Sequence, residues 1–436
     1  MSDQGKTTFK NWYIFIFSIN YLIQGVVWSM FSVIIPIYLL ILISETGATI
    51  TASDIAFLAA IIMIPWAIKL IFGILSDKFG TKKFGRRKPW IIGSITLAGI
   101  MWIIMPFVLT PANAIIIFTI LGLLINMGVA FADTALDGLI LDICPKEQLG
   151  RAQGTCWGFR SVGQIAAGPI LAIIVVSISA SVNSLFIIIG ILMIVASLTI
   201  LIIKEAEEYP EVNIIQNLKM MLSKKRDWKI YLFALFNAIV DGVIILFLSL
   251  YLLIQMGFIE AEGASLSLLE GGTDMTIYLQ QANLSIIIGV GIVIGAIVGG
   301  AFSDLISRRK SVYISLIITT VTLLVIFLPF QIIILLIIAC MIGIGMGWRH
   351  SSYSAVLGEM AKEYPELNST YYSIANSFVN FGTIIGLSIV GLIFEQTASF
   401  ILVFIIMAIA SNFGLLPFLL IDKDEYELKP ASNKEK

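Results

Sequence analysis

Long apolar segments separated by short polar ones run through the whole chain. Each apolar segment reaches or exceeds the roughly 20 residues that an α-helix needs to cross the hydrocarbon core of a bilayer, and the longer ones must tilt or protrude into water. Turn residues and charges separate one segment from the next. The pattern predicts an all-α integral membrane protein with twelve transmembrane helices, over residues 11–43, 54–76, 89–109, 112–142, 152–178, 183–203, 229–256, 275–302, 310–328, 331–360, 369–395 and 399–421.

The composition supports a membrane protein and excludes several other classes. Hydrophobic residues make up 58% of the chain and charged residues 13%, and the mean hydropathy is +0.99. The net charge of -1 gives no global attraction to nucleic acid. The three cysteines lack metal-ligand spacing, and no nucleotide-binding loop or nucleophile–base set is visible. We therefore expect no enzyme activity, no cofactor, no metal and no nucleic-acid partner.

Basic residues fall on one side of the predicted helices. All but three of the 27 Lys and Arg residues lie in alternate loops or at the termini, and the exceptions, Lys69, Arg160 and Arg349, lie inside helices. Loops rich in Lys and Arg stay cytoplasmic. We expect a multi-pass protein of the cell membrane with both termini cytoplasmic.

The chain shows an internal duplication. The segment from Gly73 to Asp77 and the segment from Gly300 to Asp304 share the pattern G-x-x-S-D, and a basic run follows each. The longest polar connection lies between the sixth and seventh predicted helices. We predict an N-terminal six-helix bundle over 1–203, a cytoplasmic linker over 204–228, a C-terminal six-helix bundle over 229–422 and a cytoplasmic tail over 423–436. Two homologous halves are typical of transporters whose site lies between the repeats.

The repeated G-x-x-S-D-basic loop resembles the signature of the major facilitator superfamily. A narrower resemblance is to folate-biopterin transporters, muropeptide permeases and acetyl-CoA transporters. It rests on the run from Ala52 to Trp90, on A-D-x-x-x-D at 132–137 and on C-W-G-F-R at 156–160. The resemblance implies the two-bundle major facilitator fold, with the third, sixth, ninth and twelfth helices on the outside. Light-harvesting assembly proteins are related to the same subgroup.

Ionisable residues lie inside the helices that this fold places around its centre. Such residues are costly in contact with lipid, so each should face a cavity or a partner. Lys69, Asp133 and Arg160 each lie about 12 to 14 Å from the cytoplasmic end of their helices, and Asp241 and Arg349 about 18 to 20 Å. We predict that Lys69, Asp133 and Arg160 form one layer and that Asp241 pairs with Arg349 across the cavity. The predicted substrate and proton site comprises Lys69, Asp133, Arg160, Asp241, Arg349 and His350.

Each of these residues also has a structural interpretation. The buried charges could be ion pairs that hold the bundle together, and His350, the only histidine, could be a packed neutral imidazole or a proton switch. Trp28, Trp66, Trp157 and Trp348 could line a cavity for a flat aromatic ligand or belong to interface belts and ordinary packing. Both interpretations stay open at the level of sequence.

Charged residues near the cytoplasmic helix ends suggest a gate. The basic run from Lys78 to Lys88 could bind anionic lipid, but Asp77 and Asp142 lie at adjacent helix ends where Arg86 or Arg151 can reach them. The predicted cytoplasmic gate comprises Asp77, Arg86, Asp137, Asp142, Arg151, Asp304, Arg308 and Glu359. Glycines at small-xxx-small spacing, Gly291, Gly295 and Gly299 and then Gly382 and Gly386, predict close helix packing.

These features predict a monomeric secondary active transporter, a symporter that moves a small organic solute by alternating access. The buried cations favour an anionic solute, and the titratable groups favour coupling to protons. Sodium is the less favoured ion, because no unwound, carbonyl-rich break is visible in the helices. A sugar–cation symporter is the alternative, since such symporters share a similar G-R-R-x-P loop. A scaffold or assembly factor that transports nothing is the alternative from another class.

Overall fold

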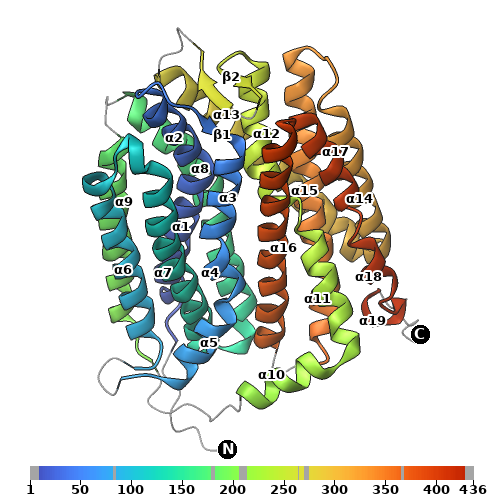
Figure 1. The fold of residues 1–436 in the computed structure, drawn as a ribbon. Coiled ribbons are helices and arrows are strands. Elements are labelled where there is room, and N and C mark those ends of the chain that lie inside the picture. Colours follow the sequence, from blue (N-terminus) through green and yellow to red (C-terminus); the bar gives the residue numbers. More distant parts are fainter. Residues whose placement is uncertain are drawn as a thin grey trace, which may run out of the picture. The chain divides into compact units, whose positions relative to one another are not determined.

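The computed structural model is almost entirely helical (Figure 1). It describes residues 9–81, 85–177, 182–205, 214–263, 265–269, 274–364 and 368–427. Among the described residues, ten helical segments are long and apolar enough to cross a membrane. The two other predicted spans, 152–178 and 310–328, coincide with α8 (Lys146–Ser177) and α14 (Arg308–Val325). The prediction of an all-α membrane protein is confirmed.

The chain divides into two compact units. The first comprises Met1–Ile50, Ile61–Asn213 and Ser267–Asn283, and the second comprises Thr51–Ala60, Ile214–Leu266 and Leu284–Lys436. The division falls within α3 (Ala52–Ile62), α13 (Asp274–Leu305) and two of the three short strands. The domain boundaries expected from the linker stay a prediction.

The first unit is built from long helices in which α6 packs on α7 and α9, and α1 packs on α8 (Figure 1). Its elements are α1 (Tyr13–Ser29), a π-helical turn (Met30–Ile34), α2 (Ile35–Ser44), α4 (Ile64–Ala67), α5 (Lys69–Lys78), α6 (Lys88–Val108), a 3-10 turn (Pro111–Asn113), α7 (Ala114–Ile143), α8, α9 (Val182–Leu198) and a second 3-10 turn (Thr199–Ile202).

In the second unit, α11 packs on α16, and α14 packs on α15 and α17. The elements are α10 (Ile214–Ser223), α11 (Lys225–Asn237), α12 (Asp241–Gln255), α13, α14, α15 (Ile332–Ala361), α16 (Asn368–Thr397), α17 (Phe400–Ala410), α18 (Leu415–Leu419) and α19 (Lys423–Tyr426). Three strands, β1 (Ile50–Thr51), β2 (Ile259–Glu262) and β3 (Ser265–Leu268), form one small sheet in the order β1-β3-β2.

Short turns interrupt the helix within the second and seventh spans. The second consists of α3, α4 and α5, and Pro65 lies at the start of α4. Proline lacks the N–H that would continue the ladder and clashes with the carbonyl four residues before it. The seventh span is broken at residues 238–240, between α11 and α12. Neither proline nor glycine lies within this second break, so the sequence shows no signal for it.

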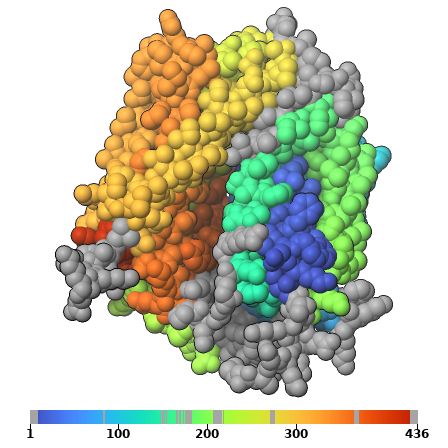
Figure 2. All heavy atoms as spheres, turned by 180° about the vertical axis from the view of Figure 1, so that it is seen from behind, coloured from blue at the N-terminus to red at the C-terminus, as the bar shows by residue number. Residues whose placement is uncertain are grey.

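Glycines allow helices to approach closely in both units. A Cβ at Gly291 or Gly295 of α13 would overlap backbone carbonyls of α15. On α16, a Cβ at Gly382 would overlap a carbonyl of α11, and a Cβ at Gly386 would overlap the carbonyl of Ile239, just after α11. The predicted close packing of these glycines is therefore confirmed. In the first unit, α1 and α8 lie side by side (Figure 2).

Candidate functional site

The break in the second span positions two residues of the candidate site. Lys69 is the first residue of α5, directly after the break, and Trp66 lies in the short α4. The indole N–H of Trp66 donates to Oδ1 of Asn126 on α7 at 2.9 Å, and the amide of Asn126 donates to the carbonyl of Gly122. These bonds fix α4 against α7 and direct Lys69 toward the same helix.

Asp133 on α7 joins two cations from two other helices. Its Oδ2 lies 3.1 Å from Nζ of Lys69, and its Oδ1 lies 3.1 Å from Nη1 of Arg160 on α8. Lys69 is 7% exposed, Asp133 1% and Arg160 6%, so the charges are withdrawn from solvent. The structure thus brings together the three residues of the predicted layer. We call them the Asp133 cluster, which also includes Tyr21 and Asp137, described below.

Arg160 retains binding capacity beyond its ion pair. Its Nε is buried and has no hydrogen-bond partner among the described residues. The guanidinium lies 5.1 Å from the ring centre of Trp66 and 4.9 Å from that of Trp157. Arginine between aromatic rings keeps its planar donors aligned and desolvated. Of the four tryptophans considered in the sequence, these two flank the cluster.

Asp137, one turn along α7 from Asp133, accepts a hydrogen bond from the hydroxyl of Tyr21 on α1. It lies close enough to Asp133, Lys69 and Arg160 to interact with their charges. Asp137 therefore belongs to this cluster, whereas the sequence assigned it to a gate. Tyr21 was missed, because a tyrosine in an apolar helix carries no charge that would distinguish it.

A second cluster lies where α5 and α7 end and α6 begins. Arg87 is 6% exposed. It forms ion pairs with Asp77 and, at 3.1 Å, with Asp142, and it donates to Oγ of Ser76 at 2.7 Å. Arg86 pairs with the same Asp142 oxygen at 2.8 Å. The predicted contact between the basic loop and Asp142 is therefore confirmed, but Arg87, which the prediction left out, is its most buried member.

Glu205 binds the backbone at the start of α6, next to this cluster. Its carboxylate accepts the backbone N–H groups of Arg86, Arg87 and Lys88 at 2.7 to 3.1 Å. These are donors that the start of a helix leaves without intrahelical partners, and a carboxylate there also complements the helix dipole. The side chain of Arg151, also predicted for the gate, lies outside the described residues.

In the second unit, the structure corrects the pairing predicted for Asp241. The Oδ2 of Asp241, at the start of α12, lies 3.2 Å from Nε2 of His350, and Arg349 turns instead to Asn237. Arg349 is fully buried and donates to the side-chain and backbone oxygens of Asn237, the last residue of α11. The helix break leaves that carbonyl without its usual partner, and the guanidinium supplies one. The adjacent residues Arg349 and His350 thus contact opposite ends of the same break, Arg349 at Asn237 before it and His350 at Asp241 after it.

A cluster in the second unit repeats the contacts of Arg86, Asp142 and Glu205 in the first. Arg308 pairs with Glu359 at 2.8 Å, as Arg86 pairs with Asp142. Glu427 accepts the backbone N–H groups of Arg308 and Arg309 at 3.0 and 3.1 Å, as Glu205 does at α6. Asp304, however, is exposed and forms no ion pair with any described residue.

Asp227 was missed by the sequence interpretation. It is fully buried near the start of α11 and accepts hydrogen bonds from the hydroxyls of Tyr364 and Tyr371. Burial and the nearby carboxylate raise the pKa of Tyr364, so the hydroxyl stays a donor. Asp227 lies among the basic residues of a predicted linker, where a solvated carboxylate is the ordinary expectation.

These features describe a helical membrane protein with buried charges gathered inside each of two units. Within the described ranges, no three His, Cys, Asp or Glu side chains are grouped to hold a metal ion. The class that combines such units is the multi-pass membrane transporter. A family profile described as the Major Facilitator Superfamily matches residues 17–273 and 271–436, and the chain belongs to that family.

Two curated proteins are similar to part of the chain. A transporter named AmpG 1 of Rickettsia felis is 32% identical over 129 residues, which are 29% of this chain and 29% of that protein. A protein of Arabidopsis thaliana named folate-biopterin transporter 4 is 28% identical over 114 residues, which are 25% of this chain and 23% of that protein. The chain thus matches less than a third of the length of either relative.

Solved structures share the fold along nearly the full chain. A bacterial homologue of the human lysosomal transporter Spinster has a TM-score of 0.67 at 13% identity and covers 98% of this chain and 100% of its own. A D-xylose-proton symporter has a TM-score of 0.69 at 12% identity, with 94% and 98% covered. The nucleoside transporter NupG has a TM-score of 0.68 at 14% identity, with 94% and 100% covered. At these identities the likeness shows the fold alone.

Proposed function

We propose that this chain is a secondary active transporter that moves a small organic anion by alternating access in symport with protons. The observation that carries the proposal is the charge balance of the Asp133 cluster. Two cations, Lys69 and Arg160, share one fully paired carboxylate, and the second carboxylate, Asp137, is bound to an uncharged tyrosine.

The balance of these charges links a proton to an anion. With both carboxylates ionised, the cluster is neutral. A proton on Asp137 leaves one net positive charge, which a bound anion would neutralise. By linkage, each of the two ligands then strengthens the binding of the other. Proton and anion would therefore bind and be released together.

The shape of the site supports an anion with an aromatic or apolar part. Nε of Arg160 has no hydrogen-bond partner within the described ranges, and its fork matches the geometry of carboxylate and phosphate. Trp66 and Trp157 offer ring faces beside it. The name of one curated relative, a folate-biopterin transporter, makes pterin-like anions a first candidate. Muropeptide-like and acyl-CoA-like anions follow from the resemblance carried by residues 52–90, 132–137 and 156–160.

Sodium remains the less favoured ion, for a structural reason. The helix break at residues 238–240 could offer carbonyl oxygens to a cation, but Arg349 already donates to the carbonyl of Asn237. A fixed guanidinium there opposes a second positive charge. The proposal includes the location of the protein. We propose that it is a monomeric multi-pass protein of the cell membrane, with both termini cytoplasmic.

The test is uptake into liposomes that contain the purified protein. Candidate anions and neutral sugars are supplied outside, with and without an outside-acid pH gradient and with or without sodium. The proposal predicts that an anion accumulates only with the pH gradient. Accumulation of a neutral sugar would support the sugar–cation alternative. If no solute accumulates and the protein instead co-purifies with one fixed membrane partner, the scaffold alternative gains support.

A further inference from the structure

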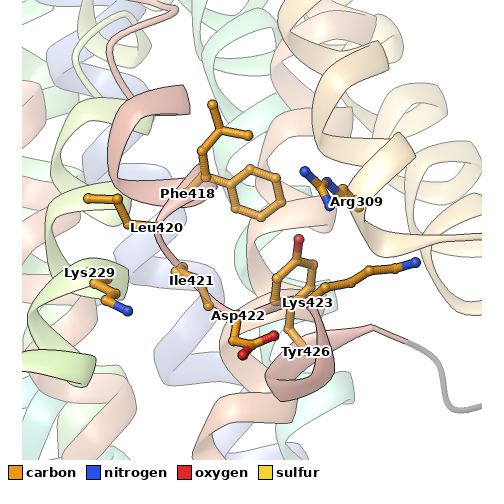
Figure 3. Close-up of a pocket in the computed structure, with 9 residues that line it drawn as sticks. Lys229, Arg309, Phe418, Leu420, Ile421, Asp422, Lys423 and Tyr426 are labelled. Atoms are coloured by element: carbon orange, nitrogen blue, oxygen red, sulfur yellow. The ribbon is translucent and has the colours of Figure 1, made fainter.

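A pocket of about 400 Å³ lies in the second unit, next to the cluster of Arg308, Glu359 and Glu427 (Figure 3). Lys229 from α11, Arg309 from α14 and Phe418 from α18 line it, together with the segment from Leu419 to Lys423 and Tyr426 of α19. Three helices and the end of the last predicted span therefore meet around one hollow.

The pocket carries an excess of positive charge. Its lining includes three cations, Lys229, Arg309 and Lys423, and one carboxylate, Asp422. That carboxylate accepts the backbone N–H of Asp424 and caps α19. None of the three cations forms an ion pair with a carboxylate in the described part of the chain. The pocket thus offers cationic groups whose charges are not neutralised by a direct partner.

The internal repeat shows that this availability is specific to the second unit. Arg87 and Arg309 are the second arginines of the two R-R-K runs. Arg87 is committed to Asp77, Asp142 and Ser76. Arg309 donates from Nε to the hydroxyl of Tyr313 at 2.8 Å and lines the pocket, while Asp304, the counterpart of Asp77, stays exposed.

A buried hydroxyl also points into the pocket. Tyr426 is 1% exposed, and its ring packs against Phe418 with centroids 5.2 Å apart. Its hydroxyl points toward the space between Phe418 and Arg309 and makes no hydrogen bond to any described residue (Figure 3). Burial raises the pKa of Tyr426 to about 12, so at neutral pH the group is an available donor.

The rim beside the pocket is apolar. The last candidate span ends at Leu419, and Leu416 and Leu420 are 68% and 66% exposed. Cationic groups therefore lie where the polar headgroups of a bilayer begin, next to side chains that face acyl chains.

We propose that this pocket binds the phosphate-bearing headgroup of an anionic phospholipid. Lys229, Arg309 and Lys423 neutralise the phosphate, and Tyr426 donates a hydrogen bond to it. The acyl chains lie along the exposed leucines at and just after α18. A soluble phosphate ester would use the cations but not the apolar rim. This assignment is independent of the transported solute.

The test measures lipid binding by the full-length protein in detergent, by native mass spectrometry. Phosphatidylglycerol, phosphatidylcholine with the same acyl chains, and glycerol phosphate are titrated separately. The pocket variant carries Lys229→Gln and Lys423→Gln. The matched control carries Lys219→Gln and Lys310→Gln, which remove the same charge from exposed lysines outside the pocket. A further variant, Tyr426→Phe, removes only the hydroxyl.

We expect phosphatidylglycerol to bind more tightly than phosphatidylcholine. Each interfacial lysine contributes favourably to the binding of anionic lipid, so the pocket variant should weaken it about tenfold, with the control within about twofold. Tyr426→Phe should weaken it about threefold, since one hydrogen bond to a charged group is lost. Equal binding by the pocket and control variants would overturn the proposal. So would binding of glycerol phosphate as tight as that of the lipid.

Discussion

Nη1 of Arg160 lies 3.1 Å from Oδ1 of Asp133, and the other oxygen of the same carboxylate is bound by Lys69. A buried carboxylate between two cations is stable only while the local charge stays balanced, because an unpaired buried charge is costly. Asp137 supplies the balancing charge one helical turn away. The account of proton-coupled anion transport rests on this arrangement.

Asp137→Asn should uncouple transport from protons. The amide keeps the size of the side chain but can neither gain nor lose a proton, so the cluster stays at one net positive charge. We expect exchange of the anion between the two sides to persist while accumulation driven by a pH gradient is lost. Counterflow and gradient-driven uptake in liposomes measure the two activities separately.

Tyr21→Phe is the control for that substitution, since it removes the hydrogen bond to Asp137 and leaves the carboxylate. Uptake driven by a pH gradient should persist in this variant. Wild-type accumulation by Asp137→Asn would exclude Asp137 as the proton site.

Gly25→Ala should destabilise the first unit. A Cβ at Gly25 would overlap the carbonyl of Arg160 and the backbone of Gly163, so α1 and α8 would have to separate. Overpacking of this kind costs about 1 to 3 kcal/mol. The matched control is Gly158→Ala on α8, where a Cβ meets nothing within 4 Å. There a helix-interior alanine should leave stability unchanged or raise it by up to about 1 kcal/mol. The melting temperatures of both variants in detergent check this, and an equal melting temperature would contradict the close contact.

Asp142→Asn should weaken the cluster at the end of α7, whereas Asp304→Asn should not. Asp142 holds both Arg86 and Arg87, and its side chain is 16% exposed. The loss of its charge should cost about 1 to 2 kcal/mol, less than a fully buried pair because solvent screens it partly. Asp304 is exposed and unpaired in the described structure, so its neutralisation should stay within about 0.5 kcal/mol. Unfolding in a denaturing detergent measures both, and equal losses would argue against the asymmetry between the halves.

Arg349→Lys should destabilise the break between α11 and α12. The guanidinium serves two oxygens of Asn237 at once, and a single ammonium group lacks that fork. We expect Arg349→Lys to lower the free energy of unfolding by about 2 kcal/mol. Arg349→Met should lower it further, because it leaves the carbonyl of Asn237 without a donor. Thermal unfolding of the three proteins should rank them in that order. A methionine variant as stable as wild type would show that the carbonyl needs no partner.

The sequence predicted the helices and the first-half ion pairs because both follow from strong constraints. Apolar length fixes a span, and a buried charge requires a partner at the same depth, as for Lys69, Asp133 and Arg160. Depth alone could not assign partners in the second half. The break after Asn237 turns a carbonyl toward Arg349 and frees Asp241 for His350, and no proline or glycine within it indicates the break. Tyr21 and Asp227 escaped notice because their roles depend on contacts between distant helices.

The most direct test of the central claim is a ligand screen by thermal shift on the purified protein, repeated with Arg160→Ala. Pterin-like, muropeptide-like and acyl-CoA-like anions are compared with neutral sugars at equal concentration. The account predicts that one class of anion raises the melting temperature of the wild type and that Arg160→Ala abolishes the rise. Stabilisation by neutral sugars that survives Arg160→Ala would contradict it.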